Sequence, residues 1–94
     1  MKEWNFLTKH GRALLCIAHD PEVRLRDIAE TLAITERSAY SIVGDLTTAG
    51  YVVKERDGRR NRYLIQGHLP MPDATAGERT IGEVLEVLLV EQVA

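Results

Sequence analysis

The sequence predicts an α+β fold that is mainly helical, in which three helices and a β-hairpin are followed by one further helix. Three observations support this prediction. Two short amphipathic segments lie on either side of Ala33-Ile34, at the spacing of a helix pair. Two runs rich in β-branched and aromatic residues flank the turn sequence Asp57-Gly58. A strongly apolar segment, Thr80 to Val93, follows a stretch that contains glycines and prolines.

The first helix is expected between Thr8 and Asp20. The Thr8 hydroxyl can accept a backbone N–H at the helix start, and Asp20 precedes a proline, a position that avoids helical backbone. Its apolar residues are Ala13, Leu14, Leu15, Ile17 and Ala18. Before it, the dense apolar cluster of Trp4, Phe6 and Leu7 is expected to pack on the domain or on a second subunit.

The next two helices are predicted from apolar residues that recur at helical spacing. In the first they are Leu25, Ile28, Ala29 and Leu32, and in the second Ala39, Ile42, Val43 and Leu46. Thr35 is a suitable N-cap for the second helix, and the small Ala29 and Ala39 permit a close crossing. This pattern is that of a helix-turn-helix, although an ordinary pair of core helices has the same apolar faces.

A β-hairpin is expected directly after Gly50, a residue suited to the left-handed position that follows a helix. Its strands would be Tyr51 to Arg56 and Arg62 to Gln66, joined by a short basic loop. A helix-turn-helix followed at once by such a hairpin is a winged helix. The wing is placed at residues 56–62.

The C-terminal part is expected to hold a linker and a helix that promotes dimerisation. Residues 67–77 contain turn-forming residues, and Thr80 with Glu83 matches a capping box. A helix this apolar must bury itself against its own domain or against a second copy. The residues predicted to form a dimer interface are Trp4, Phe6, Ile81, Val84, Leu85 and Leu88.

Charge is distributed unevenly in a chain whose formal net charge is −2. Residues 1–68 hold eleven lysines and arginines against nine acids, whereas residues 69–94 hold one against five. Because binding senses the local field, the first part is the better candidate for an anionic partner. No apolar run is long enough to span a bilayer, no signal sequence is visible, and the single Cys16 cannot form an internal disulfide, so we expect a cytoplasmic protein.

Two basic or polar surfaces are suited to double-stranded DNA, which needs cations for phosphates and donors for base edges. The first is the outer face of the recognition helix, residues 35–49, where Arg37 is the best candidate for a guanine contact. The second is the arginine-rich wing tip, where like charges gathered so closely would be relieved by phosphates. Arg26 is either an ordinary exposed arginine or a phosphate contact at the edge of this surface. The predicted DNA-binding residues are Arg26, Thr35, Glu36, Arg37, Ser38, Tyr40, Ser41, Arg59, Arg60, Asn61 and Arg62.

Residues 8–66 resemble the winged helix-turn-helix of the MarR-type bacterial transcriptional regulators, within a wider group that includes the ArsR-type repressors. The similarity is carried by Leu25-Arg26-Asp27-Ile28-Ala29, Thr35-Glu36-Arg37-Ser38-Ala39, Ala49-Gly50-Tyr51-Val52 and Asp57-Gly58-Arg59-Arg60. It implies a DNA-binding domain over residues 1–67 and an arginine, Arg59, that enters the minor groove while Asp57 helps to hold it. It also implies a homodimer, which the linker and helix at 68–94 would form, so that truncation after Gly67 would leave a monomer with weaker DNA binding.

Four other functions compete with DNA binding. An enzyme is disfavoured because the sequence has no phosphate-binding glycine loop, no HExxH and no nucleophile with a base at telling spacing. A metal sensor would have only Cys16, His10, His19 and His68 as ligands, at poor spacing, and no cofactor is indicated. A redox role for Cys16 lacks a second, resolving cysteine. A winged helix that binds another protein remains an alternative, and the negative net charge suits it. The sequence names no small-molecule effector.

Overall fold

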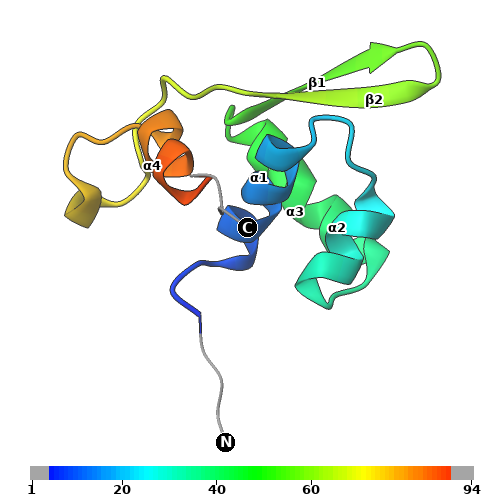
Figure 1. The fold of residues 1–94 in the computed structure, drawn as a ribbon, viewed down its shortest axis with the longest axis horizontal. Coiled ribbons are helices and arrows are strands. Elements are labelled where there is room, and N and C mark those ends of the chain that lie inside the picture. Colours follow the sequence, from blue (N-terminus) through cyan, green and yellow to red (C-terminus); the bar gives the residue numbers. More distant parts are fainter. Residues whose placement is uncertain (1–4, 90–94) are drawn as a thin grey trace, which may run out of the picture.

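The computed structural model describes residues 5–89, and it confirms an α+β chain that is mainly helical (Figure 1). Helices α1 (Lys9–His19), α2 (Leu25–Leu32) and α3 (Glu36–Thr48) come first. Strands β1 (Val52–Asp57) and β2 (Arg60–Ile65) follow, then a short 3₁₀ turn at Ala74–Ala76 and helix α4 (Ile81–Leu88). None of the helices in the described part has the length and apolar character required to cross a bilayer.

Threonine side chains begin three of the four helices, as the sequence predicts. Thr8 accepts a hydrogen bond from the Gly11 N–H, Thr35 from that of Ser38, and Thr80 from that of Glu83. The Glu83 carboxylate in turn accepts from the Thr80 N–H at 2.8 Å, which completes the predicted capping box. Helix α2 differs, because Arg24 stands at its N-cap and provides no side-chain hydrogen bond.

The turn between α2 and α3 contains a residue with a strained backbone, Ala33, which the sequence does not predict. Ala33 ends α2 with a left-handed backbone, φ 58°, and its N–H is bonded to the carbonyls of Ala29 and Glu30. A left-handed alanine is uncommon because its Cβ crowds the backbone. Hydrogen bonds from this turn, including Ile34 N–H to Ala29 O at 2.9 Å, hold it and set the path into α3.

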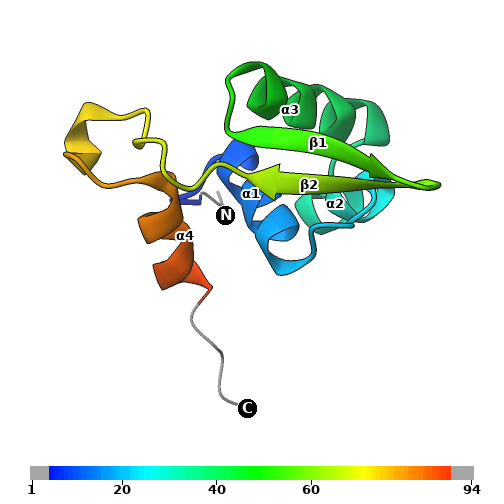
Figure 2. The same ribbon diagram turned by 90° about the horizontal axis from the view of Figure 1, so that it is seen from above.

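The two strands form an antiparallel hairpin whose tip projects past α2 (Figures 1 and 2). Pairing runs from Val52 opposite Ile65 to Asp57 opposite Arg60, which leaves Gly58 and Arg59 as a two-residue loop. Gly58 has φ 65°, the positive value that the first position of a type II′ turn requires. The N–H of Tyr63 also donates to the carbonyl of Pro21 at 2.8 Å, which joins the hairpin to the loop after α1.

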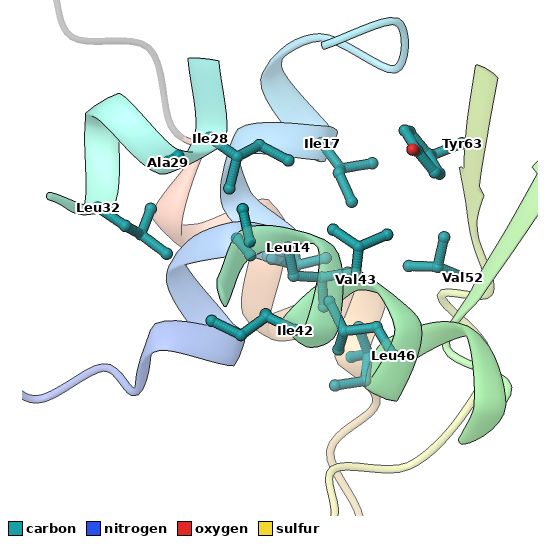
Figure 3. Close-up of a cluster of buried hydrophobic side chains, with 14 residues drawn as sticks. Leu14, Ile17, Ile28, Ala29, Leu32, Ile42, Val43, Leu46, Val52 and Tyr63 are labelled. Carbon is teal, nitrogen blue, oxygen red and sulfur yellow. The ribbon is translucent and has the colours of Figure 1, made fainter. Parts of the chain in front are cut away.

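One apolar core lies between the first three helices, the hairpin and α4 (Figure 3). Ile17, Ile28 and Val52 are its largest fully buried side chains. The apolar faces predicted for the second and third helices are confirmed, since all of these residues are buried except the half-buried Leu25: Ile28, Ala29, Leu32, Ala39, Ile42, Val43 and Leu46.

The segment between β2 and α4, which the sequence predicts as a linker, is bonded to itself and to the start of α4 through its backbone. Backbone hydrogen bonds join Met71 N–H to Arg79 O at 2.9 Å and Ile81 N–H to Leu69 O at 2.7 Å. A third joins Gly82 N–H to Gly67 O at 2.9 Å. These bonds hold residues 67–71 beside residues 79–82, so the chain between them forms a closed loop.

Two residues assigned to a dimer interface lie instead in the core of their own chain. Ile81 and Leu85 are 7% and 8% exposed, because α4 packs against α1. They are therefore not available to a second copy in this conformation. Val84 is half-buried, whereas Leu88 and the neighbouring Val87 are exposed.

Two residues of the predicted N-terminal apolar cluster, Phe6 and Leu7, lie in the described part of the chain and differ in exposure. Phe6 is 90% exposed, so it is not buried against its own domain, and the alternative contact with a second subunit stays a prediction. Leu7 is half-buried and lines an apolar hollow of about 190 Å³ between α1 and α4. Trp4 lies outside the described residues.

The same substitution at two glycines is expected to change stability in opposite directions. A Cβ on Gly82 would lie 2.9 Å from the carbonyl oxygen of Gly67, a backbone atom, whereas a Cβ on Gly44 would meet nothing within 4 Å. Gly82→Ala should therefore destabilise the fold by about 1–3 kcal/mol through overpacking. Gly44→Ala, in an exposed helix interior, should stabilise it by about 0.5–1 kcal/mol. Urea unfolding measures the free energy of unfolding of both variants. A change of the same sign in the two would contradict the close approach of Gly82 to the Gly67 carbonyl.

Candidate nucleic-acid interface

A groove of about 460 Å³ opens between the hairpin tip and the beginnings of α2 and α3. The loop after α1 and the start of α2 form one wall with residues 22–26, and Glu36 adds the first residue of α3. The hairpin forms the other wall with residues 59–61 and Tyr63. The fold thus brings together charged segments that lie more than thirty positions apart in the sequence, such as Arg26 and Arg59.

The groove is positively charged although the chain as a whole is negative. Four arginines line it against two glutamates, Glu22 and Glu36, which leaves a formal excess of two positive charges. The whole chain carries a formal charge of −2. The arginines are Arg24, Arg26, Arg59 and Arg60. A concave surface lined by one sign of charge concentrates ions of the opposite sign, so the groove is suited to an anion.

Three of these arginines have no acidic partner. For Arg24, Arg26 and Arg59, the described part of the structure shows no side-chain hydrogen bond or ion pair. Arginines placed together without carboxylates repel one another, and a bound phosphate would relieve this repulsion. Arg60 differs, since its Nη1 lies 2.9 Å from Glu22 Oε1.

The remaining hairpin residues of the predicted site divide between the groove and its edge. Asn61 is half-buried and lines the groove. Arg62 does not line it, but its Nη1 lies 3.5 Å from the second carboxylate oxygen of Glu22. Arg56, on β1, donates from Nε to the Gly58 carbonyl at 3.3 Å across the turn. The side chain of Asp57, expected to hold Arg59, lies outside the described part.

The outer face of α3 forms a second exposed surface. It begins next to Glu36, which lines the groove, but its other residues do not line the groove. Arg37, Tyr40 and Ser41 are all exposed, and Tyr40 is 68% exposed, an unusual value for an aromatic residue. Gly44, seven positions after Arg37, lies on the same side of the helix. Of the predicted residues on α3, only Glu36 lines the groove.

Thr35 and Ser38 are engaged with each other at the start of α3. The Thr35 hydroxyl accepts from the Ser38 N–H at 3.0 Å and donates to the Ser38 hydroxyl oxygen at 3.0 Å. The predicted capping role of Thr35 is therefore confirmed. A role in phosphate binding stays a prediction, and it would use the remaining hydrogen-bonding capacity of the Ser38 hydroxyl.

Tyr63 contributes to the groove in a way that the sequence did not suggest. It is 5% exposed, and burial raises the pKa of its phenol, so it stays protonated as a hydrogen-bond donor. No hydrogen bond of its hydroxyl occurs within the part of the chain that the structure describes. Because no fully buried side-chain oxygen of the described residues lacks a partner, this hydroxyl is accessible and can donate to a ligand in the groove.

Arg24 and Glu22 also line the groove, although the sequence alone assigns them no role. No local pattern marks these residues, because Glu22 lies in a turn and Arg26 in the first turn of α2, so the charges follow neither a strand period nor a helix period. Their convergence is visible only once the hairpin is known to lie against this segment.

Metal and thiol chemistry find little support in the described residues. They contain no group of three or more His, Cys, Asp or Glu side chains that could hold a metal ion. His10 instead contacts Asp45 of α3, with Nε2 and Oδ2 2.8 Å apart. Cys16 is half-buried, and burial raises the pKa of its thiol, which lowers the fraction of reactive thiolate.

Comparison of the sequence with models of known protein families and with curated proteins found no match. What the chain binds is therefore inferred from the groove and from the outer face of α3.

Proposed function

We propose that this chain is a winged helix-turn-helix domain that binds double-stranded DNA and regulates transcription. In this proposal α3 enters the major groove and the hairpin acts as a wing that contacts the adjacent minor groove. The observation that carries it is the convergence of three arginines without acidic partners, Arg24, Arg26 and Arg59, on one groove beside the exposed face of α3. The resemblance of residues 8–66 to MarR-type regulators, seen in the sequence motifs, supports the same activity. A transcriptional regulator of this kind would act in the cytoplasm.

The exposed face of α3 has the composition expected of a helix that reads base edges. Arg37 can donate two hydrogen bonds to a guanine, a contact worth about 1–3 kcal/mol of discrimination. Gly44 would allow the helix backbone to approach DNA closely at a position where alanine would favour the helix more. Tyr40 and Ser41 lie between them and can donate to phosphates or bases.

A homodimer is part of this proposal, since two copies would read half-sites about 34 Å apart. Val87 and Leu88 of α4 are apolar and exposed. Val87 is 70% exposed, so its side chain is accessible to a second copy. Ile81 and Leu85, which fill the core, hold this helix in place rather than forming the interface.

Val87→Lys should convert the dimer to a monomer and weaken DNA binding, because a buried lysine in a dimer interface lacks a partner. Sedimentation velocity measures the oligomeric state. Val53→Lys, at another exposed valine on β1, is the matched control and should leave the dimer intact. Truncation after Gly67 is a poorer test, because it would also remove Ile81 and Leu85 from the core. A Val87→Lys protein that sediments as the unchanged protein does would remove this interface from the proposal.

Selection of bound duplexes from a random pool, at stated salt concentrations, tests the function directly. We expect a recurring sequence to be retained, with affinity that falls steeply as salt rises. Arg37→Ala should relax sequence preference, whereas Arg59→Ala should weaken binding to all duplexes. If no duplex is retained and both variants behave as the wild type, the chain would instead be a protein-interaction module, which its negative net charge suits.

A further inference from the structure

Glu22 links the two walls of the groove through a pair of arginines. Its Oε1 lies 2.9 Å from Arg60 Nη1, and its Oε2 lies 3.5 Å from Arg62 Nη1. Each carboxylate oxygen therefore faces one guanidinium group of β2. Within the described residues, no other carboxylate pairs with two arginines.

The backbone around Glu22 is held by hydrogen bonds on both sides. The Glu22 N–H donates to Asp20 Oδ1 at 3.0 Å, and the Val23 N–H donates to Asp20 O at 2.9 Å. The bond from Tyr63 N–H to Pro21 O, 2.8 Å long, fixes this loop against β2 itself. The carboxylate thus sits at a defined position next to Arg60 and Arg62, and its own side chain is half-buried.

A guanidinium group has five N–H donors in one plane, and Glu22 occupies only part of this set on each arginine. Arg60 also lines the groove, so its remaining donors are available to a ligand there. A side chain locked by a neighbour binds a target with less loss of conformational freedom. The same negative charge reduces the attraction of the groove for any phosphate, whatever the DNA sequence.

We propose that Glu22 is a positioning residue for specificity, which orients Arg60 and Arg62 and lowers the affinity of the wing for non-specific DNA. This inference rests on the proposed DNA-binding function. The role of Glu22 differs from that of Arg24, Arg26 and Arg59. Within the described residues these arginines have no acidic partner, and they supply electrostatic attraction for phosphate rather than orientation.

Glu22→Gln tests the proposal, because glutamine keeps the shape of the side chain and removes its charge. Affinity is measured for the selected duplex and for a scrambled duplex of equal length, at one salt concentration. We expect scrambled-duplex affinity to rise about five-fold, the effect of one unit charge removed near a phosphate in water. Affinity for the selected duplex should change much less. The ratio of selected-duplex affinity to scrambled-duplex affinity should therefore fall by nearly five-fold. Nitrogen relaxation of the guanidinium groups should also show more motion of Arg60 and Arg62 in the free variant.

Glu78→Gln is the matched control, since Glu78 is exposed and lies on the segment at the end of the molecule opposite the hairpin tip (Figure 2). It changes the net charge equally and should leave the affinity ratio unchanged. If Glu22→Gln leaves the ratio of the two affinities unchanged, the proposed role of Glu22 would be overturned, while the proposed DNA-binding function would stand. A wild-type protein that binds neither duplex would overturn the proposed function together with it.

Discussion

Neutralising the three unpartnered groove arginines is expected to reduce affinity for duplex DNA by about 100-fold at physiological salt. The variant is Arg24→Gln/Arg26→Gln/Arg59→Gln, which removes the cations without acidic partners and leaves the Glu22 pairs intact. If each arginine neutralises one phosphate, three fewer counterions are released on binding. The plot of log affinity against log salt should then become shallower by about 2.7. A salt titration followed by fluorescence anisotropy measures both quantities.

The control for this variant neutralises cations elsewhere. Lys9→Gln/Arg79→Gln changes residues at the start of α1 and before α4, neither of which lines the groove. It should reduce affinity only slightly and leave the salt slope close to that of the wild type. Since all the exchanged side chains are polar and on the surface, circular dichroism should show both variants folded. An affinity loss per removed charge that is equal in the triple variant and the double variant would show that net charge, rather than the groove, controls binding.

Replacing Ile28 with alanine is expected to destabilise the fold by about 2–5 kcal/mol. Ile28 is fully buried on α2 between the other helices of the core (Figure 3). The truncation removes apolar contacts and leaves a cavity that close-packed neighbours cannot fill. This loss is a large share of the 5–15 kcal/mol that stabilises a typical small domain. Urea unfolding monitored by circular dichroism gives the change in the free energy of unfolding.

Ile28→Val provides a graded comparison, with an expected loss of about 0.5–1.5 kcal/mol because only one methylene is removed. Leu88→Ala, at an exposed residue of α4, should cost much less than Ile28→Ala. A small effect of Ile28→Ala would mean that α2 does not depend on this core. The position of Arg24 and Arg26 beside the hairpin would then need another explanation.

Helix positions were predictable because their signals lie within a few residues of each other. Thr8, Thr35 and Thr80 each cap a helix as predicted, and Gly58 occupies the predicted turn. The prediction of a linker did not foresee the backbone hydrogen bonds of this segment, because the bonded residues, such as Gly67 and Gly82, are fifteen positions apart. The hydrogen bonds between their backbones leave no mark on composition. The assignment of Ile81 and Leu85 to a dimer failed for a related reason, since an apolar helix face does not indicate which surface will cover it.

By itself, the sequence determined the elements of this protein, their order and the two surfaces rich in polar and basic residues. These follow from local backbone preferences and from apolar spacing along one helix or strand. Only the tertiary structure decided that Arg24, Arg26 and Arg59 share a groove, that Glu22 holds Arg60 and Arg62, and that α4 completes the core. Each of these depends on how segments far apart in the chain pack together, and packing is set by the shape of the whole core.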